Sequence, residues 1–450
     1  MLLEQSTQSL IDYGKYFAYP QISLEPIRRR QDPELAQSII NLAKNKLAKT
    51  GTNKVTEPLF FVGSVDFMVR NDDDGKTFYV LESNGGNSRG FSAMPVKHWL
   101  QSYDSYAQSL HFAKSENPTV LIGHPNKDLL LYEKIFLAEY LVQKMKKKDP
   151  NAEAVHAANI TGKRLKQGNL VIIGPYKDIL SRLSIYKNNY VYFEGKKLDV
   201  LIGDGIARRK PEIVEHLLKN DLESLVVNDV FFLTDDKALT YMAVDEVAHL
   251  LANYSVEPIA FKRAQNDREL KKITTDILDE IPEVLIKPHG GSGGSGIDII
   301  SKKEQVQKKI ESSKEHYEEK FGPTRNPFPY TVCQRVEATP IEWNDALHHY
   351  DIRVYVGRSK DRIVPLGALM RVSLEPFSGH FNKKSFVVNL SGYEGVDTDR
   401  GFGVNKDSLK LFNLEKSDFA KMFAAACTLS AYMNNNYSKL IKKALVDEKN

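Results

Sequence analysis

The stretch VLIKPHGGSGGSGIDII, residues 284–300, places two runs of strand-forming residues on either side of a glycine loop. Residues 290–296 are five glycines and two serines, and Lys287 lies just before them. Glycine lets backbone N–H groups approach phosphate oxygens closely, and a nearby lysine adds a positive charge. The segment therefore predicts a strand–loop–strand unit that binds phosphate. The alternative interpretation is a plain flexible surface loop.

Three familiar glycine-loop sites do not fit this segment, although residues 291–296 match G-x-G-x-x-G. A dinucleotide-binding loop opens a helix, whereas the residues that follow here are the strand-forming IDII. A Walker A loop ends in Gly-Lys-Ser/Thr, whereas Ile297 follows Gly296. In protein kinases the lysine follows the loop, and their H-R-D and D-F-G motifs are missing from this sequence.

The motifs on both sides of the loop, taken in order, resemble the ATP-grasp superfamily, in the branch of glutathione synthetase and ribosomal-protein glutamate ligase. The residues that carry this resemblance are Asn228, Asp236-Lys237-x-x-Thr240, Ile286-Lys287-Pro288, the glycine loop, Gln334-x-x-Glu337, Asp351-Ile352-Arg353, Arg371 and Asn389. Each motif alone is weak, and their order and spacing are more specific.

The resemblance implies a nucleotide site and gives each residue a role in it. Lys237 and Lys287 would hold the phosphates, and the loop would fold over them. Glu337 would take the ribose hydroxyls, and the strand before it would lie beside adenine. Arg353 and Arg371 would be catalytic and would face the transferred phosphoryl group, for which an arginine fork is suited. The ATP-binding set is Lys237, Lys287, Gly291, Ser292, Gly293, Gly294, Ser295, Gln334, Arg335, Val336, Glu337 and Asn389.

The family's magnesium ligands do not follow Asn389, where the resemblance would place them, but a matching hairpin occurs near the start of the chain. The segment VGSVDFMVRNDDDGKTFYVLESN, residues 62–84, has two strand-like runs around an acidic turn. Glu82 and Asn84 share one face of their strand, and Asp66 lies on the partner strand. Two carboxylates and an amide are hard oxygen ligands of the kind that Mg²⁺ uses. The alternative is an ordinary hairpin with surface acids.

We therefore expect an α/β (α+β) chain with the ATP-grasp fold in circularly permuted order and a Rossmann-like α/β domain. Such a permutation only relocates a surface break in the chain. The expected units are 1–105, a permuted segment with the metal hairpin; 106–230, a Rossmann-like substrate domain; 231–330, the subdomain with the glycine loop; and 331–450, the second subdomain with a terminal helix.

Local patterns predict individual elements. Asp32 and Gly51 delimit a helix over about 34–48. NYVYFEG, residues 189–195, is expected to continue the strand series of the Rossmann-like domain. One helix is expected to start near TDDKALTYMAVDEVAHLLANY, residues 234–254, and another to cover about 416–444. The second carries an apolar stripe that is typical of core packing: Phe419, Met422, Phe423, Ala426, Leu429 and Met433.

The composition is that of a globular protein and excludes a disordered or collagen-like chain. The 450 residues include 62 Lys and Arg against 58 Asp and Glu, and 42% are hydrophobic. Two cysteines, Cys333 and Cys427, make no disulfide framework. The first residues lack the features of a signal peptide, and no apolar run is long enough to span a bilayer. We expect a cytoplasmic protein without nucleic-acid or membrane partners.

Substrate recognition is the least specified part of the sequence. Arg208 and Arg209 follow the strand-like segment LDVLIGDG, where glutathione synthetase-like enzymes bind a substrate carboxylate. A solvated basic turn is an equal alternative. Arg89, in GGNSRG, is a second candidate for the same role. His348 and His349 lack spaced ligand partners and are expected to be ordinary structural residues.

The resemblance implies an ATP-dependent carboxylate–amine or carboxylate–thiol ligase that works through an acyl phosphate. The expected cofactors are ATP and Mg²⁺, with two ions, and Mn²⁺ as an alternative metal. The expected partners are a small-molecule carboxylate, an amine and, as a further option, a carrier protein; a homodimer is compatible with the sequence. The alternatives are an ATP-grasp small-molecule kinase and a non-catalytic ATP-binding regulatory protein.

Overall fold

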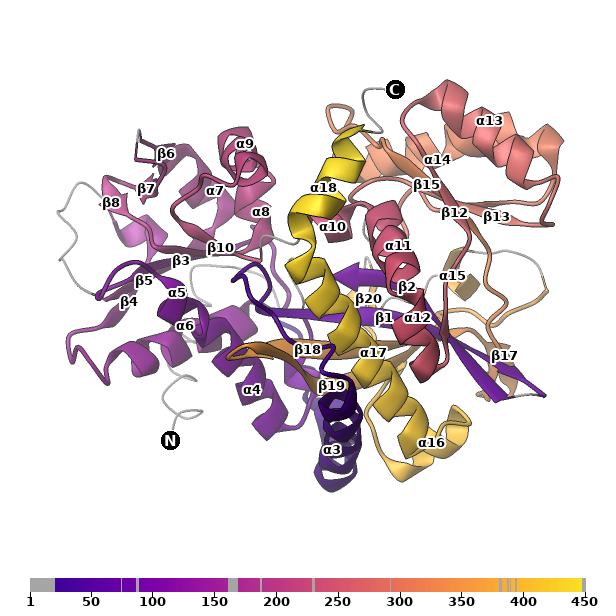
Figure 1. The fold of residues 1–450 in the computed structure, drawn as a ribbon, viewed down its shortest axis with the longest axis horizontal. Helices are drawn as coiled ribbons and strands as arrows, with labels where there is room; N and C mark the ends of the chain where they lie inside the picture. The colour runs from indigo at the N-terminus through magenta and orange to yellow at the C-terminus, as the bar shows by residue number, and fades with distance from the viewer. Residues whose placement is uncertain are drawn as a thin grey trace.

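The structure is a computed structural model. It describes residues 21–446, with gaps at 74, 86–88, 161–168, 187, 229–230, 292, 380–382, 387, 389 and 393–394. Figure 1 shows a parallel sheet on one side of the molecule and the glycine-loop sheet on the other, with a large antiparallel sheet between them. Among the described residues, no helix is long and apolar enough to cross a membrane.

The central sheet has six strands and joins segments from both ends of the chain. Its order is β11 (Val256–Glu257), β2 (Gly75–Asn84), β1 (Val62–Asp72), β18 (Tyr350–Ser359), β19 (Arg362–Val372) and β22 (Gly401–Phe402). The β1–β2 hairpin predicted from the sequence is present, and β1 pairs antiparallel with β18. The predicted metal hairpin therefore lies beside the strand that carries Arg353.

The register of the central sheet decides which side chains share a face of the sheet with Asp66. Asp66 pairs with both Glu82 and Arg353, whereas Phe67 pairs with Val80. Leu81 is thus an extra residue in β2, a β-bulge. The bulge places Val80 and Glu82 on opposite faces, although residues two apart in a regular strand share a face.

Helices cover one face of the central sheet and form a continuous apolar core with it. They are α3 (Pro33–Thr50), α11 (Lys237–Glu246) and α17 (Lys416–Asn435), and α3 packs along α17. The Asp32 carboxylate accepts hydrogen bonds from two backbone N–H groups and caps α3, and Gly51 ends it with a φ of +65°. The predicted apolar stripe of α17 lies in this core, which confirms its packing role.

The other face of the central sheet contacts α4 (Val96–Ala107) and, through it, the α/β unit. That unit has a five-stranded parallel sheet in the order β10 (Leu225–Val227), β9 (Val200–Ile202), β3 (Thr119–His124), β5 (Leu170–Pro175) and β4 (Glu153–His156). The strand predicted in NYVYFEG is present, but it lies outside the parallel sheet. Residues Val191–Phe193 form β7 of a separate antiparallel sheet with β6 (Leu183–Ile185) and β8 (Lys196–Lys197).

The glycine-loop unit is a four-stranded antiparallel sheet. Its order is β12 (Phe261–Ala264), β15 (Tyr330–Gln334), β13 (Val284–Lys287) and β14 (Asp298–Ile300). The loop connects β13 to β14 as a strand–loop–strand unit, in agreement with the prediction. The helices α13 (Asp267–Ile277) and α14 (Val306–Phe321) pack against this sheet.

Two helices predicted as continuous are interrupted. The terminal helix breaks at Asn436 into α17 and α18 (Tyr437–Val446). The helix expected over 234–254 is divided into α11, α12 (Ala248–Leu251) and a 3₁₀ turn, η4 (Ala252–Tyr254), and the short helix α10 (Phe231–Asp235) precedes it. Asp236 divides α10 from α11 by capping the latter, since its carboxylate accepts the N–H of Ala238. Helical periodicity did not reveal the breaks at Val247 and Asn436.

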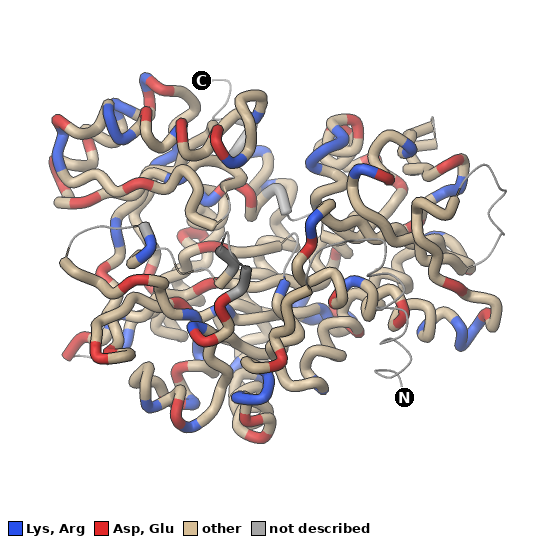
Figure 2. Tube along the Cα trace, turned by 180° about the vertical axis from the view of Figure 1, so that it is seen from behind, with Lys and Arg blue, Asp and Glu red and all other residues tan. Residues whose placement is uncertain are grey.

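The remaining elements are short or peripheral. The helices are α2 (Glu25–Arg29), α5 (Ser109–Phe112), α6 (Leu131–Met145), α7 (Tyr176–Ile179), α8 (Asp204–Ala207), α9 (Pro211–Lys219), α15 (Lys383–Phe386) and α16 (Lys406–Leu411). The strand pairs are β16 (Ile341–Trp343) with β17 (Ala346–His348), and β20 (Ser391–Gly392) with β21 (Gly395–Val396). The 3₁₀ turns are η1 (Phe91–Ala93), η2 (Ala157–Asn159), η3 (Leu180–Arg182) and η5 (Lys303–Gln305). Acidic and basic residues are interspersed along the whole fold (Figure 2).

Candidate functional site

A cavity of about 790 Å³ lies between the central sheet and the glycine-loop sheet. One part is lined by charged side chains, and another by apolar ones. The predicted site residues that line it are Asp66, Glu82, Asn84, Lys237, Lys287, Gly291, Gly293, Gly294, Ser295, Gln334, Val336, Arg353 and Arg371. The structure thus brings together residues from β1, β2, α11, β13, β15, β18 and β19.

Asp66 is the centre of the charged part of this cavity. Its carboxylate is only 2% exposed and accepts hydrogen bonds from Arg353 Nε at 2.8 Å and from Arg371 Nη2 at 2.9 Å. Burial disfavours ionisation of Asp66, but the two guanidinium groups outweigh it and hold the pKa of the carboxyl well below its ordinary range. Asp66 is therefore an anion held by two cations.

Glu82 and Asn84 complete an acidic corner beside Asp66. Lys237 Nζ, at the first turn of α11, donates to Glu82 Oε2 at 2.5 Å. The Asn84 amide lies 3.3 Å from Glu82 Oε1 and 3.4 Å from Asp66 Oδ2. Burial acts to raise the pKa of Glu82, but Lys237 overcomes it and the net pKa is lowered. Both carboxylates are thus ionised and close to one amide.

Arg371 has a second acidic partner in Asp351, the residue opposite it in the β18–β19 pair. Arg371 Nε donates to Asp351 Oδ1 at 2.7 Å, and both side chains are buried. Burial, reinforced by the charge of Asp66, raises the pKa of Asp351 above its ordinary value despite the attraction of Arg371. Because Asp351 and Asp66 both accept hydrogen bonds from the guanidinium of Arg371, they restrict its orientation.

Lys287 differs from the other cations of the cavity. It is 7% exposed, and its ammonium donates a hydrogen bond of 2.7 Å to the hydroxyl of Tyr241. Within the described part of the chain, no carboxylate lies at ion-pair distance from Lys287. A buried ammonium without an anionic partner carries a desolvation cost that an anionic ligand would remove. This geometry favours binding of an anion next to Lys287.

The glycine loop adopts backbone conformations that L side chains rarely take. Gly293 and Gly294 have φ angles of +60° and +72°. Successive residues of this kind direct N–H groups into a concave surface that suits an anion. Ser295 fixes one side of the loop by donating to the carbonyl of His316 in α14 at 2.9 Å. The loop is therefore both glycine-dependent and anchored.

The apolar part of the cavity is suited to a flat hydrophobic group. Its side chains come from three strands, from loops that adjoin the glycine-loop sheet and from α15: Met68, Leu81, Ile259, Leu285, Ile297, Val336 and Phe386. Gln334 and Val336 of the predicted hinge line it, but Arg335 pairs with Glu283, and Glu337 lines an adjacent cavity of about 190 Å³. Glu337 therefore does not line the cavity that contains Lys237 and Lys287, and its predicted contact with ribose stays a prediction.

The donor set of the acidic corner fits Mg²⁺. Among the described residues, no group of three His, Cys, Asp or Glu side chains is arranged to hold a metal ion. Magnesium, however, commonly takes one or two carboxylates and completes its shell with phosphate oxygens and water. Asp66, Glu82 and Asn84 supply such a set, since the amide lies within 3.4 Å of both carboxylates.

Comparison with solved structures shows a shared fold. A candidate gamma-glutamylcysteine synthetase from Methylobacillus flagellatus KT aligns over 95% of this chain and 99% of its own, with 12% identity and a TM-score of 0.52. The chain has the ATP-grasp fold. Two other similar structures have lower scores. A glutathione synthetase-like effector from Globodera pallida has 13% identity, coverage of 78% and 81%, and a TM-score of 0.41. D-alanyl-alanine synthetase A from Vibrio cholerae has 9% identity, coverage of 66% and 78%, and a TM-score of 0.33.

Sequence comparison alone gives no such likeness, since no family model and no curated protein matches the chain. The ATP-grasp fold is thus visible in the arrangement of strands and helices at an identity where sequence similarity is no longer detected.

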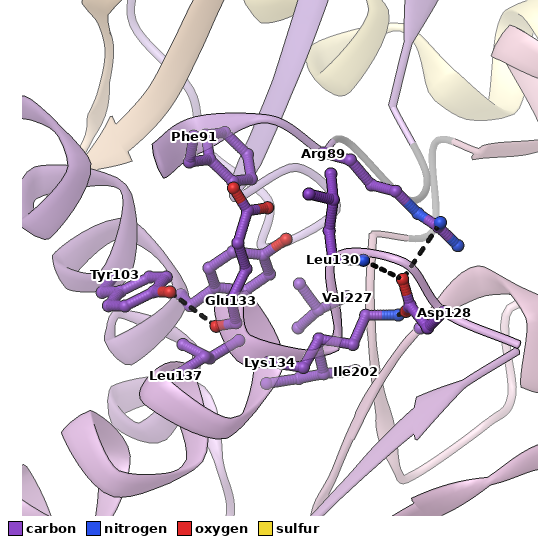
Figure 3. Close-up of a pocket in the computed structure, with 12 residues that line it drawn as sticks. Arg89, Phe91, Tyr103, Asp128, Leu130, Glu133, Lys134, Leu137, Ile202 and Val227 are labelled. Atoms are coloured by element: carbon purple, nitrogen blue, oxygen red, sulfur yellow. Dashed lines mark hydrogen bonds and ion pairs between the residues drawn. The ribbon is translucent and has the colours of Figure 1, made fainter. Parts of the chain in front are cut away.

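Arg89 lies outside the main cavity of the ATP-grasp fold. It lines a small cavity of about 20 Å³ against the α/β unit and pairs with Asp128 at 3.2 Å, as Figure 3 shows. Lys134 pairs with the other oxygen of Asp128 at 3.3 Å. Nearby, the Glu133 carboxylate accepts hydrogen bonds from the backbone N–H groups of Gly90 and Ser92. The loop that carries Arg89 is thus fixed to the start of α6.

Arg208 and Arg209 are also outside the main cavity. Arg208 pairs with Asp235 at the end of α10, and Arg209 stacks over the ring of Tyr176 at 4.8 Å. Their substrate role stays a prediction. Ser292 and Asn389, both predicted to bind ATP, lie outside the described residues.

Sequence reasoning assigned no role to three contributors to the site, although Asp351 belongs to one of the motifs named above. Asp351 is two residues before Arg353 and therefore shares its strand face, a signal that was available. Tyr241 is four residues after Lys237, one helical turn away. The apolar lining had no local signal, because its members come from separate strands that only the tertiary structure brings together.

Proposed function

We propose that this protein is an ATP-dependent ligase that joins a carboxylate to an amine or thiol through an acyl phosphate. The observation that carries the proposal is the buried, carboxylate-free Lys287, which faces the same cavity as the Asp66–Glu82 pair and two arginines. A cavity with both unpaired positive charge and clustered carboxylates suits a polyphosphate bound with a divalent cation.

ATP fits the two parts of the cavity. The apolar lining near Val336 suits adenine, and the glycine loop with Lys237 and Lys287 suits the phosphates. The volume of about 790 Å³ is in the range of nucleotide-sized pockets. Support for the nucleotide thus comes from shape, from polarity and from charge.

The chemistry would proceed in two steps. A substrate carboxylate oxygen attacks the γ-phosphorus of ATP, the bond to the β-phosphate oxygen breaks, and ADP leaves. An amine nitrogen or thiolate sulfur then attacks the acyl carbon, the bond to phosphate breaks, and inorganic phosphate leaves; an amine also loses a proton. Arg353 and Arg371, which line the cavity, would stabilise the charge that develops on the transferred group. This scheme requires no nucleophile from the protein.

Asp66, Glu82 and Asn84 would hold Mg²⁺, which when bound neutralises phosphate charge. In the structure described here, Lys237 and the two arginines neutralise the same carboxylates. Binding of the metal with the nucleotide would exchange these partners, with carboxylates passing to the metal and lysine and arginine to phosphate. The number of ions, expected to be two, and the use of Mn²⁺ belong to the proposal.

We also propose that the segments of the fold are circularly permuted. The support is that β1, from the start of the chain, pairs with β18, and that α3 packs on α17 near the end. An amino acid or peptide carboxylate remains the proposed substrate class, with Arg89 and Arg208 as candidate contacts. A carrier protein as acceptor and a homodimer are further parts of the prediction.

The function is tested by ADP release from the purified protein with a panel of amino acids and amines, with and without Mg²⁺. We expect one carboxylate to stimulate release in a magnesium-dependent way, and Glu82→Ala to reduce it by about 100-fold because a carboxylate beside the phosphates is lost. The exposed Glu280→Ala variant serves as the matched control and should retain activity.

Product analysis distinguishes the ligase from its alternatives. An amide or thioester together with inorganic phosphate supports the ligase, whereas a stable phosphate ester supports a kinase. Nucleotide binding without turnover on any member of the panel, and with no effect of Glu82→Ala, would favour a regulatory ATP-binding protein.

A further inference from the structure

Tyr241 connects three elements at the edge of the candidate nucleotide site. It lies on α11 one turn after Lys237 and is 1% exposed. Its hydroxyl donates to the carbonyl of Leu81 at 2.9 Å and accepts from Lys287 Nζ at 2.7 Å. Leu81 immediately precedes Glu82 on β2, and Lys287 ends β13. One hydroxyl therefore joins the acidic strand to the base of the glycine loop.

The two hydrogen bonds of this hydroxyl have a fixed direction. Because the hydroxyl proton is donated to Leu81, only the oxygen lone pairs are available to the ammonium of Lys287. The ammonium also lies 5.3 Å from the centre of the Tyr241 ring, within reach of a cation–π attraction. Lysine has a long flexible side chain, so such contacts restrict where its charge lies.

We propose that Tyr241 is a positioning residue that holds the Lys287 ammonium in place for nucleotide phosphate. The inference rests on the proposed function, since it presumes that phosphate binds beside Lys287. A purely structural role for Tyr241 is the competing explanation, because its ring packs in an apolar cluster with Leu285 and Cys333. Replacement by phenylalanine separates the two roles, since it keeps the ring and removes only the hydroxyl.

The first experiment measures binding of ADP with Mg²⁺, and of adenosine, to full-length wild type and to Tyr241→Phe by calorimetry. We expect ADP to bind about tenfold more weakly to the variant and adenosine to bind equally to both, because only ADP has phosphates. Tyr103→Phe is the matched control. It also removes one buried hydroxyl, which donates to the Glu133 carbonyl away from the main cavity, and should leave ADP affinity unchanged.

A double-mutant cycle tests whether Tyr241 acts through Lys287. Lys287→Met alone should weaken ADP binding, and adding Tyr241→Phe to it should weaken binding no further. Additive losses, or an equal loss for adenosine and ADP, would overturn the inference.

The outcomes separate this inference from the proposed function. If wild type binds ADP and Tyr241→Phe binds it with equal affinity, only the positioning role is wrong. If wild type binds neither ADP nor ATP in the presence of Mg²⁺, the proposed function fails and the inference fails with it.

Discussion

At the scale of single residues, the candidate site is a network in which anions and cations neutralise one another. Arg353 and Arg371 surround Asp66, and Lys237 holds Glu82. Burying such charges is tolerated only when each has a partner, because an isolated buried ion is costly. Lys287, whose hydrogen bond is to a neutral hydroxyl, departs from this pattern, which makes it the most informative residue of the cavity.

Asn228 is a second residue whose role is visible only in its contacts. Its fully buried amide accepts from the N–H of Phe61 at 2.6 Å and donates to the carbonyl of Val62 at 2.6 Å. It also donates to the carbonyl of Gly85. Through these hydrogen bonds, Asn228 connects the start of β1 and the end of β2 to the segment that follows the α/β unit.

We predict that Asn228→Ala destabilises the protein by about 3 kcal/mol, because several buried backbone groups lose their partners. Urea unfolding monitored by circular dichroism measures the change. The exposed Asn253→Ala variant is the control and should change stability by less than about 0.5 kcal/mol. A loss at Asn228 no larger than that of the control would show that these groups find other partners.

At the scale of elements, the bulge at Leu81 decides where the carboxylates point. Val80 lies in the core beneath the central sheet, and Glu82 lies in the cavity on the opposite face. A regular strand would place both on one face, so Glu82 would enter the apolar core. The extra residue in β2 thus allows Val80 to pack in the core while Glu82, two residues later, faces the cavity.

Two variants test this role of the bulge. Inserting an alanine between Asp66 and Phe67 would give Leu81 a partner, remove the bulge, and turn Asp66 and Glu82 toward the core. We expect this insertion to destabilise the protein by several kcal/mol, because carboxylates would be buried among apolar side chains.

Deleting Leu81 is the matched control, because it also removes the bulge but keeps Asp66 and Glu82 on the cavity face. We expect this variant to unfold at a higher urea concentration than the insertion variant. Equal stability of the two variants would show that the bulge does not set the orientation of the carboxylates.

At the scale of the whole molecule, the site requires two sheets and both ends of the chain. The central sheet supplies the acids and arginines, and the glycine-loop sheet supplies Lys287 and the loop. Three buried histidines and one half-buried histidine matter for the whole molecule. His98 on α4, His124 in the α/β unit and His349 beside Phe377 are buried, and His289 beside the glycine loop is half-buried.

These histidines predict how stability depends on pH. Burial lowers the pKa of all four side chains to about 4, whereas the unfolded chain titrates near 6.5. Between pH 4 and 6.5 the unfolded state therefore binds more protons than the folded state, and stability falls as the pH falls.

We expect the unfolding free energy to decrease by up to about 1.4 kcal/mol per pH unit for each such histidine in this window. Urea titrations at pH 7.5, 6.0 and 5.0 measure the slope. Replacing His98 by glutamine should reduce the slope of the unfolding free energy against pH by the contribution of one proton, which is up to about 1.4 kcal/mol per pH unit. A profile that is flat from pH 7.5 to 5.0 would contradict the prediction.

Local elements were predictable because their signals are local. The acidic turn and the strand-forming residues around it define the β1–β2 hairpin, and Asp32 and Gly51 delimit α3. The glycine loop and its flanking strands follow from residues 284–300 alone. Helix breaks at Val247 and Asn436 were missed, because periodicity does not register a short interruption of an apolar pattern.

The sequence by itself determined the site's side-chain types and most of the local elements that carry them. The tertiary structure alone decided that Asp66 lies opposite Arg353, that Asp351 shares Arg371, and that Arg89 and Glu337 lie outside the main cavity. The physical reason is that β1 and β18 are almost 300 residues apart, so their pairing depends on the packing of a shared core. The register that the bulge sets between β1 and β2 depends on the same packing, and no local pattern of residues specifies it.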